Sequence, residues 1–307
     1  MKIINSLQAW IDKRKPRTPE QIEYEQYLKV VDDDIARFEQ YLDKANKDLL
    51  RVITENREDY IKFTALEDRL KKLRKMNDQK TLKIIQDEMN EYLKNSQTAR
   101  YVSHCIDEVG RWKYQLYAAK LKRNFVRPNR EEDIQERERI ANTFGKELME
   151  IVGEDSTLRF HGTPVYFAKE IINSGVITST ADRFDGYIAS TDLAGTFSAS
   201  SIKSLDRSIN FFTDFASFQR GLPCGVLFVL NEKAGDEELR KSDEMQSVDF
   251  YSHPEQLVGI VCTSEVYDMA LNWCLDNGLD SSKVFTYDSF LEYARNNKLN
   301  NNEGRSR

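Results

Sequence analysis

The sequence predicts an α+β protein in which an all-helical N-terminal region precedes a region of mixed strands and helices. Glycine marks the division, because only Gly110 of the 13 glycines lies within the first 140 residues. Scarce glycine with dense charge favours long helices, since glycine destabilises a helix interior. Residues 225–230 are apolar throughout, which predicts a central strand buried on both faces.

The first region begins with a helix start signal, in which Thr18 caps the helix, Pro19 takes its first position and Glu20 lies in its first turn. An apolar seam with alternating spacings of three and four follows, as in bundles and coiled coils. The seam consists of Leu28, Val31, Ile35, Phe38, Leu42, Ala45 and Leu49. This pattern indicates core packing or a surface that faces a partner, and a homodimer through the seam is one expectation.

The helical pattern continues less regularly to Leu70 and Leu73, and residues 76–78 are expected to break it. Two further apolar stripes predict two more helices before residue 125. The stripes are Leu82, Ile85, Met89, Leu93, and then Val102, Cys105, Ile106, Val109, Trp112, Leu116. Arg127, Pro128 and Asn129 form a linker signal. We therefore divide the chain into a helical-bundle or coiled-coil-like domain, 1–128, and a second domain, 129–307.

The second domain opens with a helix over about 130–152, and short strands and helices then alternate without a regular βαβ rhythm. The expected strands are 158–161, 187–191, 225–230, 248–251 and 257–262, and the expected helices are 165–173, 206–218, 264–277 and 289–296.

Composition excludes several classes of protein. No apolar run approaches 18 residues, so we expect no membrane span, and the start of the chain lacks the features of a secretory signal. Four cysteines show no paired metal spacing; Cys262 and Cys274 are expected to be reduced core thiols, and no metal site is predicted. Residues 1–140 carry 30 Lys+Arg and 26 Asp+Glu (+4), and residues 141–307 carry 15 and 25 (−10). The acidic second half argues against a nucleic-acid substrate.

One short motif carries the functional signal. In a strand, Arg159 and His161 would share a face, because side chains alternate with period two. Gly162 would let a ligand approach the backbone, and Thr163 adds a hydroxyl. A second hydroxyl pair, Ser190 and Thr191, ends the expected strand at 187–191.

This order of motifs resembles the ADP-ribosyltransferases over residues 155–265. The resemblance implies a split mixed β-sheet that binds NAD as a substrate, without a metal. Arg159, His161, Gly162 and Thr163 would bind the ribose or phosphate of NAD, and Ser190 and Thr191 would orient the first strand and the nicotinamide ribose. Glu244 would be the catalytic carboxylate, assisted by His161 and Ser190, with Gln246 nearby and Glu255 as the alternative carboxylate. The motifs fit neither the Arg–Ser–Glu nor the His–Tyr–Glu subclass alone.

The functional expectation is a mono-ADP-ribosyltransferase (a glycosyltransferase that releases nicotinamide) of the bacterial toxin or effector type. The helical domain would recognise a protein target, with arginine as the default acceptor. Such a protein would be soluble and cytoplasmic in the producing cell, and delivery into a host cell would not use a signal peptide. The alternatives are a non-enzymatic helical scaffold with a degenerate NAD-fold module, and a relative of the same fold that acts on RNA or a 2′-phosphate.

Overall fold

The computed structural model describes residues 17–75, 79–153, 156–178, 200–201, 205, 221–231, 247–249 and 251–297. It confirms the α+β prediction: a helical region precedes a mixed sheet with interspersed helices. The helices are α2 (Pro19–Glu55), α3 (Arg57–Lys75), α4 (Gln79–Asn95), α5 (Gln97–Arg123), α6 (Glu131–Val152), α7 (Val165–Ser174), α11 (Ser264–Asn277) and α12 (Tyr287–Asn296). The strands are β1 (Leu158–Thr163), β2 (Val176–Thr178), β3 (Ser200–Ser201), β4 (Val226–Asn231), β5 (Ser247–Asp249), β6 (Leu257–Cys262) and β7 (Val284–Thr286).

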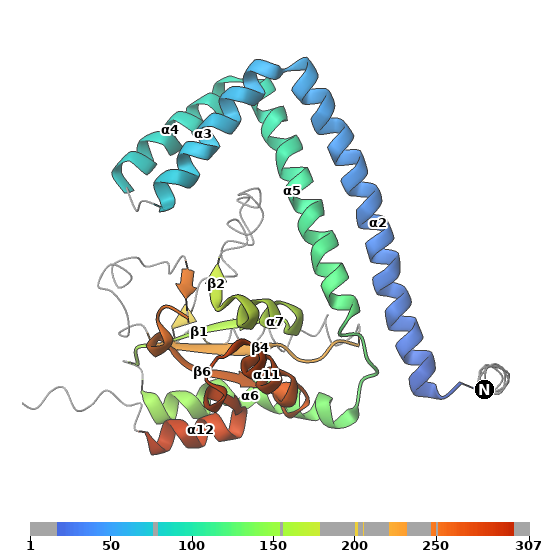
Figure 1. Cartoon of the computed structure of the whole chain (residues 1–307), viewed down its shortest axis with the longest axis vertical. Helices are drawn as coiled ribbons and strands as arrows, with labels where there is room; N and C mark the ends of the chain where they lie inside the picture. Colours follow the sequence, from blue (N-terminus) through green and yellow to red (C-terminus); the bar gives the residue numbers. More distant parts are fainter. Residues whose placement is uncertain are drawn as a thin grey trace, which may run out of the picture.

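Helices α2 to α5 form a helical arm, in which α2 and α5 run side by side away from the sheet (Figure 1). The predicted start of α2 is confirmed, because Thr18 and Gln21 form a reciprocal capping box with hydrogen bonds of 3.2 and 3.0 Å. The seam of α2 packs against α5 of the same chain: Val31 is 1% exposed, and Phe38 stacks on Trp112 with ring centroids 5.9 Å apart. The homodimer through this seam remains a prediction.

The arm bends where the sequence pattern suggested only an irregular continuation. Helix α2 ends at Glu55, and its C-cap residue Asn56 leaves the helical conformation with φ −132° and ψ 46°. Helices α3 and α4 then form a hairpin that returns toward α5 (Figure 1). Their apolar residues join α2 and α5 in a cluster separate from the main core. This tip cluster consists of Val52, Phe63, Leu66, Ile85, Met89, Val102, Cys105 and Ile106.

The main sheet has five strands in the order β3-β1-β4-β6-β7. Strand β1 is antiparallel to both β3 and β4, β4 is antiparallel to β6, and β7 is parallel to β6. Residues 226–230 of β4 are all buried, which confirms the predicted central strand. Strands β2 and β5 pair separately as a two-stranded sheet.

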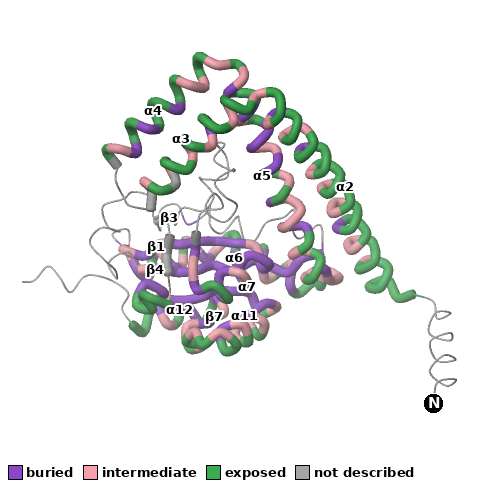
Figure 2. Tube along the Cα trace, turned by 45° about the horizontal axis from the view of Figure 1, so that its top comes forward, coloured by how far each residue is buried: buried purple, intermediate pink, exposed green. Residues whose placement is uncertain are grey.

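The main core surrounds this sheet, and Figure 2 shows the buried residues concentrated there, whereas most of the arm's outer surface is exposed. Helices α6 and α12 pack together, with Phe144 edge-on to Tyr287 at 4.6 Å between centroids. Helix α7 contacts the base of α5, where Tyr114 stacks on Phe167. The four cysteines are buried free thiols, as expected for Cys262 and Cys274.

The sequence placed most elements within two residues, but it missed the short strands. Strand β1 extends two residues beyond 161, and α12 begins at Tyr287 rather than at residue 289. Strands β2 and β7 have three residues each, too few for a period-two pattern to stand out. Within the described ranges, the model contains no helix with the length and apolar character of a membrane span.

Candidate functional site

Strand β1 carries the predicted motif at the interior of the main sheet, between β3 and β4. It pairs with β4 along its whole length, from Leu158 opposite Asn231 to Thr163 opposite Val226. Pairing on both edges satisfies the main-chain hydrogen-bonding groups of the strand. The side chains of the motif therefore project from a rigid element rather than from a loop.

Three predicted residues share one face of β1. Residues directly opposite in an antiparallel ladder lie on the same face, so His161 lies beside Phe228 and Thr163 beside Val226. The ring centroids of His161 and Phe228 are 6.4 Å apart. His161 is 2% exposed and Thr163 is 1% exposed, whereas Arg159 on the same face is half-buried. The structure thus brings Arg159, His161 and Thr163 together, with Gly162 between the last two.

The hydroxyl of Thr163 distinguishes this strand end. Its Oγ1 atom is buried and has no hydrogen-bond partner among the residues that the structure describes. A buried polar atom without a partner is unfavourable by about 1–3 kcal/mol, and native structures contain few of them. A ligand with a hydrogen-bonding group at this position would satisfy the hydroxyl.

The other predicted residues cannot be placed beside this face. Ser190, Thr191, Glu244 and Gln246 lie outside the described residues. Their nearest described neighbours in sequence are strands: β5 begins at Ser247, directly after Gln246. The contribution of these four residues remains a prediction.

Strand β3 is a neighbour of β1 that the sequence did not predict. It pairs Ser201 with Arg159 and Ser200 with Phe160. These serines follow Ala199 and lack the β-branched or aromatic side chains that mark a strand. The only signal was a second cluster of hydroxyl residues after Ser190 and Thr191.

The alternative carboxylate, Glu255, lies at the surface. It belongs to a short 3₁₀ turn, Pro254–Gln256, that precedes β6. Its side chain is 54% exposed, and Oε1 lies 3.4 Å from Nδ1 of His253. The next residue, Gln256, is buried instead, at 1% exposure. Glu255 therefore faces solvent, whereas His161 and Thr163 are enclosed.

Two of the aromatic residues that follow the motif pack toward the arm. The rings of Tyr166 and Phe167 lie 4.7 Å apart on α7. Phe167 stacks on Tyr114 of α5 at 5.8 Å, and Nζ of Lys122 lies 5.5 Å from the centre of the Tyr166 ring. Tyr117 of α5 also donates a hydrogen bond of 2.6 Å to Glu170 of α7. These contacts fix the helix that follows Thr163 against the arm.

A buried ionic cluster lies where the chain enters β4. Glu265 has a fully buried side chain; it accepts a hydrogen bond of 2.8 Å from Arg137 and one from Arg127. Its carboxylate also accepts the backbone N–H of Cys224, and Arg137 donates to the carbonyl of Leu222 at 2.8 Å. Burial raises the pKa of Glu265, and the positive charges of Arg137 and Arg127 act in the opposite direction. Every polar partner here belongs to the fold, so the cluster reads as structural.

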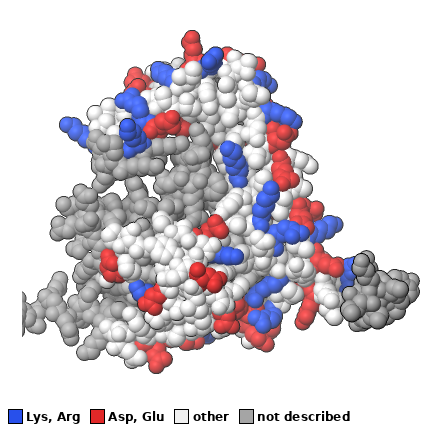
Figure 3. Space-filling model, viewed as in Figure 1, with Lys and Arg blue, Asp and Glu red and all other residues white. Residues whose placement is uncertain are grey.

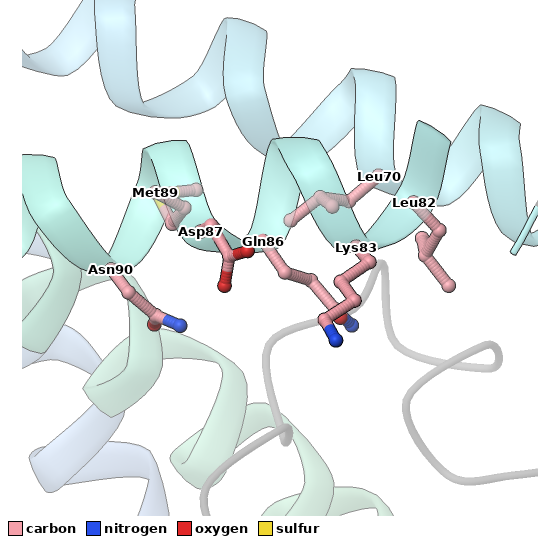
Figure 4. A pocket seen from close by; sticks show the side chains of 7 residues that line it. All are labelled: Leu70, Leu82, Lys83, Gln86, Asp87, Met89 and Asn90. Atoms are coloured by element: carbon pink, nitrogen blue, oxygen red, sulfur yellow. The ribbon is translucent and has the colours of Figure 1, made fainter. Parts of the chain in front are cut away.

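A hollow of about 610 Å³ lies on the α3–α4 hairpin (Figure 4). Its apolar part is formed by Leu70, Leu82 and Met89, and its polar part by Lys83, Gln86, Asp87 and Asn90. No described group of three or more His, Cys, Asp and Glu residues is arranged to hold a metal ion. Neither feature supplies chemistry comparable to the motif on β1.

Comparisons with protein-family models, with curated proteins and with solved structures find no significant match to this chain. The functional argument therefore rests on the residues of the chain and on their geometry.

Proposed function

We propose that this protein is an NAD-dependent mono-ADP-ribosyltransferase that modifies a protein target. The observation that carries the proposal is the face of β1, where a buried His161 and the buried, unpartnered hydroxyl of Thr163 lie on one rigid strand. The motif resemblance supports NAD as the substrate, and the split arrangement of a five-stranded and a two-stranded sheet agrees with the fold that the resemblance implies.

Each residue of β1 has a specific role in this proposal. His161 and Thr163 donate or accept hydrogen bonds at the ribose of NAD, because both are polar groups enclosed on the same face. Gly162 allows the substrate to approach the backbone. Arg159 binds a phosphate, since its planar guanidinium makes two charge-assisted hydrogen bonds to such a group.

The reaction transfers ADP-ribose from NAD to the acceptor and releases nicotinamide. The bond between nicotinamide and the ribose breaks as positive charge develops on the ribose, and an acceptor nitrogen, of arginine by default, forms the new bond and loses a proton. A nearby carboxylate stabilises such an oxocarbenium-like state, as carboxylates do in glycoside hydrolysis. We assign this role to Glu244, with Ser190, Thr191 and Gln246 orienting the ribose and the acceptor.

The arm is the part of the molecule that we assign to target recognition. It extends from the sheet, and Figure 3 shows Lys and Arg interspersed with Asp and Glu along its surface. A long surface of mixed charge suits contact with a protein better than contact with a nucleic-acid backbone, which requires a basic face. The toxin or effector role belongs to the same proposal.

The test measures nicotinamide release from NAD by the full-length protein. Wild type should release nicotinamide, His161→Ala should lower kcat/KM by about a hundredfold through lost positioning, and Glu244→Gln should lower kcat by a similar factor. Glu255→Gln is the matched control and should retain wild-type turnover, because the Glu255 side chain is exposed.

Normal turnover after Glu244→Gln would refute the assignment of that residue, and loss of turnover in Glu255→Gln would transfer the role to Glu255. Thermal unfolding with millimolar NAD gives a second readout, since a ligand that binds only the folded state raises the melting temperature. No nicotinamide release and a flat melting temperature would favour the non-enzymatic scaffold.

A further inference from the structure

Tyr251 joins three elements that are distant in sequence. It follows β5 by two residues, and β5 pairs with β2 so that Asp249 lies opposite Val176. Gly175 directly precedes Val176 and ends helix α7. The β2–β5 ladder therefore has Tyr251 and Gly175 at the same end.

The ring of Tyr251 packs directly over Gly175. A Cβ atom added at Gly175 would overlap Cδ2 and Cε2 of that ring. Gly175 also has a φ of +70°, and its N–H donates to the carbonyl of Ile171 at 2.8 Å, as in a left-handed helix cap. Glycine is required here twice, for its backbone conformation and for its lack of a side chain.

The hydroxyl of Tyr251 reaches the C-terminal ends of two helices. It is 3.0 Å from the carbonyl oxygen of Asn277 in α11 and 3.4 Å from that of Ile172 in α7. Carbonyls in the last turn of a helix lack partners within the helix, so a hydroxyl donor satisfies groups that are otherwise available to water. A hydrogen bond of 3.0 Å between Asn277 Nδ2 and Asn173 Oδ1 joins the same two helix ends.

These contacts connect the two parts of the proposed site. Helix α7 begins at Val165, two residues after Thr163 of the β1 motif. Strand β5 begins directly after Gln246 and three residues after Glu244. Tyr251 thus ties the strand that follows the proposed catalytic carboxylate to the helix that follows the NAD-binding strand.

We propose that Tyr251 is a positioning residue of the ADP-ribosyltransferase site: it holds the β2–β5 pair against the ends of α7 and α11 and thereby sets the carboxylate segment relative to β1. This inference rests on the proposed function. Tyr251 does not touch the substrate, so its loss changes the rate of bond breaking more than the binding of NAD. A displacement of about 1 Å at a reacting group lowers turnover by about a hundredfold.

The experiment compares Tyr251→Ala and Tyr251→Phe in the full-length protein. Tyr251→Ala should lower kcat for nicotinamide release by about tenfold to a hundredfold and leave KM for NAD unchanged. The backbone amides of Val176–Thr178 and Ser247–Asp249 should exchange with solvent about tenfold faster or more, because local opening sets their exchange. Tyr251→Phe keeps the ring over Gly175 and should restore most of both quantities.

Two glycine variants provide a second route and a matched control. Gly175→Ala displaces the ring of Tyr251 and should reproduce the loss of kcat. Gly278→Ala places the same residue at the same φ of +70°, but an added Cβ would meet no atom within 4 Å. It should retain the wild-type kcat, which separates the loss of the ring contact from backbone strain.

Wild-type kcat in Tyr251→Ala would overturn the inference, whether or not the amides exchange faster, because the strand would then be held for another purpose. An equal rise in KM and fall in kcat in Tyr251→Phe and Tyr251→Ala would also overturn it. If wild type releases no nicotinamide, the proposed function fails. The exchange rates then still decide whether Tyr251 holds β2 against β5, and unchanged rates would remove that contact as well.

Discussion

The arm and the sheet region use the same ionic chemistry in opposite environments. In the arm, Arg123 pairs with Asp32 and Lys120 with Glu39, and all four side chains are 46–54% exposed. In the sheet region, the side chains of Arg137 and Glu265 are 7% and 0% exposed. Exposed pairs contribute about 0–1 kcal/mol, whereas removing one partner of a buried pair destabilises a protein by about 3–5 kcal/mol. The number of ion pairs therefore says little about where stability resides.

The two regions also differ in how their cores are connected. The tip cluster at the far end of the arm is separate from the main core, which runs from the base of α2 through the sheet to α12. Strand pairs such as β1 with β4 join residues about 70 positions apart in sequence. Damage in the arm should thus stay local, and damage in the sheet region should spread.

The largest effect is expected from Glu265→Gln. The substitution removes the carboxylate that compensates the buried Arg137 guanidinium and leaves the shape of the side chain unchanged. We expect the free energy of unfolding in urea to fall by about 3–5 kcal/mol. Asp288→Asn is the control, because its pair with Arg139 is exposed and the variant should lose at most about 1 kcal/mol. Equal losses in the two variants would contradict the distinction between the regions.

Matched truncations should separate the two cores. Ile140 in the main core and Ile85 in the tip cluster are 1% and 2% exposed. Ile→Ala at either site should be unfavourable by about 2–5 kcal/mol. Ile140→Ala should lower global stability, whereas Ile85→Ala should speed amide exchange in α3 and α4 and leave β4 protected. Faster exchange in β4 after Ile85→Ala would show that the arm and the sheet open as one unit.

Asp107 of α5 should make the arm sensitive to pH. Burial raises the pKa of Asp107 to about 6, while the charges of His104 and Arg111 oppose the shift. Unfolded Asp titrates near about 3.9, so between that pH and about 6 the folded protein keeps a proton that the unfolded chain has lost. Stability therefore falls as pH rises through this window and stays lower above it.

Asp107→Asn should remove this dependence. The side chain is half-buried, so we expect the variant to be more stable than wild type by about 1–3 kcal/mol at pH 7.5, with little difference near pH 4. Urea unfolding at the two pH values measures this effect. A variant that shows the same stability difference from wild type at both values would exclude Asp107 as the source.

The smallest effect is expected from Asp32→Asn in the arm. Arg123 Nε lies 2.6 Å from Asp32, but both side chains are about half exposed. The variant should lose at most about 1 kcal/mol, and the loss should shrink in high salt because ions screen exposed charges. A larger loss that salt does not change would mean that this pair is coupled to the core at the base of the arm.

The sequence predicted those elements in which one physical signal dominates. Strand β6 and helix α11 have the predicted bounds, and Gly175 ends α7 in the expected left-handed cap. The buried face of β1 followed from the alternation of Arg159, His161 and Thr163. These features depend on local period and local backbone conformation, which neighbouring residues determine.

Other features required contacts that no local pattern contains. The bend at Asn56 follows from packing of the α3–α4 hairpin on α5, although the apolar spacing continues toward Leu70. The carboxylate of Glu265 meets Arg137 across 128 positions of sequence, so neither residue signals the pair. Tyr251 was assigned only to the end of a strand, because its contact with Gly175 is visible only after the chain has folded.

Arg127 has a consequence for any attempt to divide this chain. It precedes the predicted boundary at residue 128, yet its backbone N–H donates to the carbonyl of Gly221 at 2.7 Å and its guanidinium reaches Asp133 and Glu265. A fragment cut at that boundary would leave the entry to β4 without two of its donors. Exchange of the N-terminal module between proteins would thus have to carry residue 127 with the recipient half, and recombination one residue later would start from a weakened sheet.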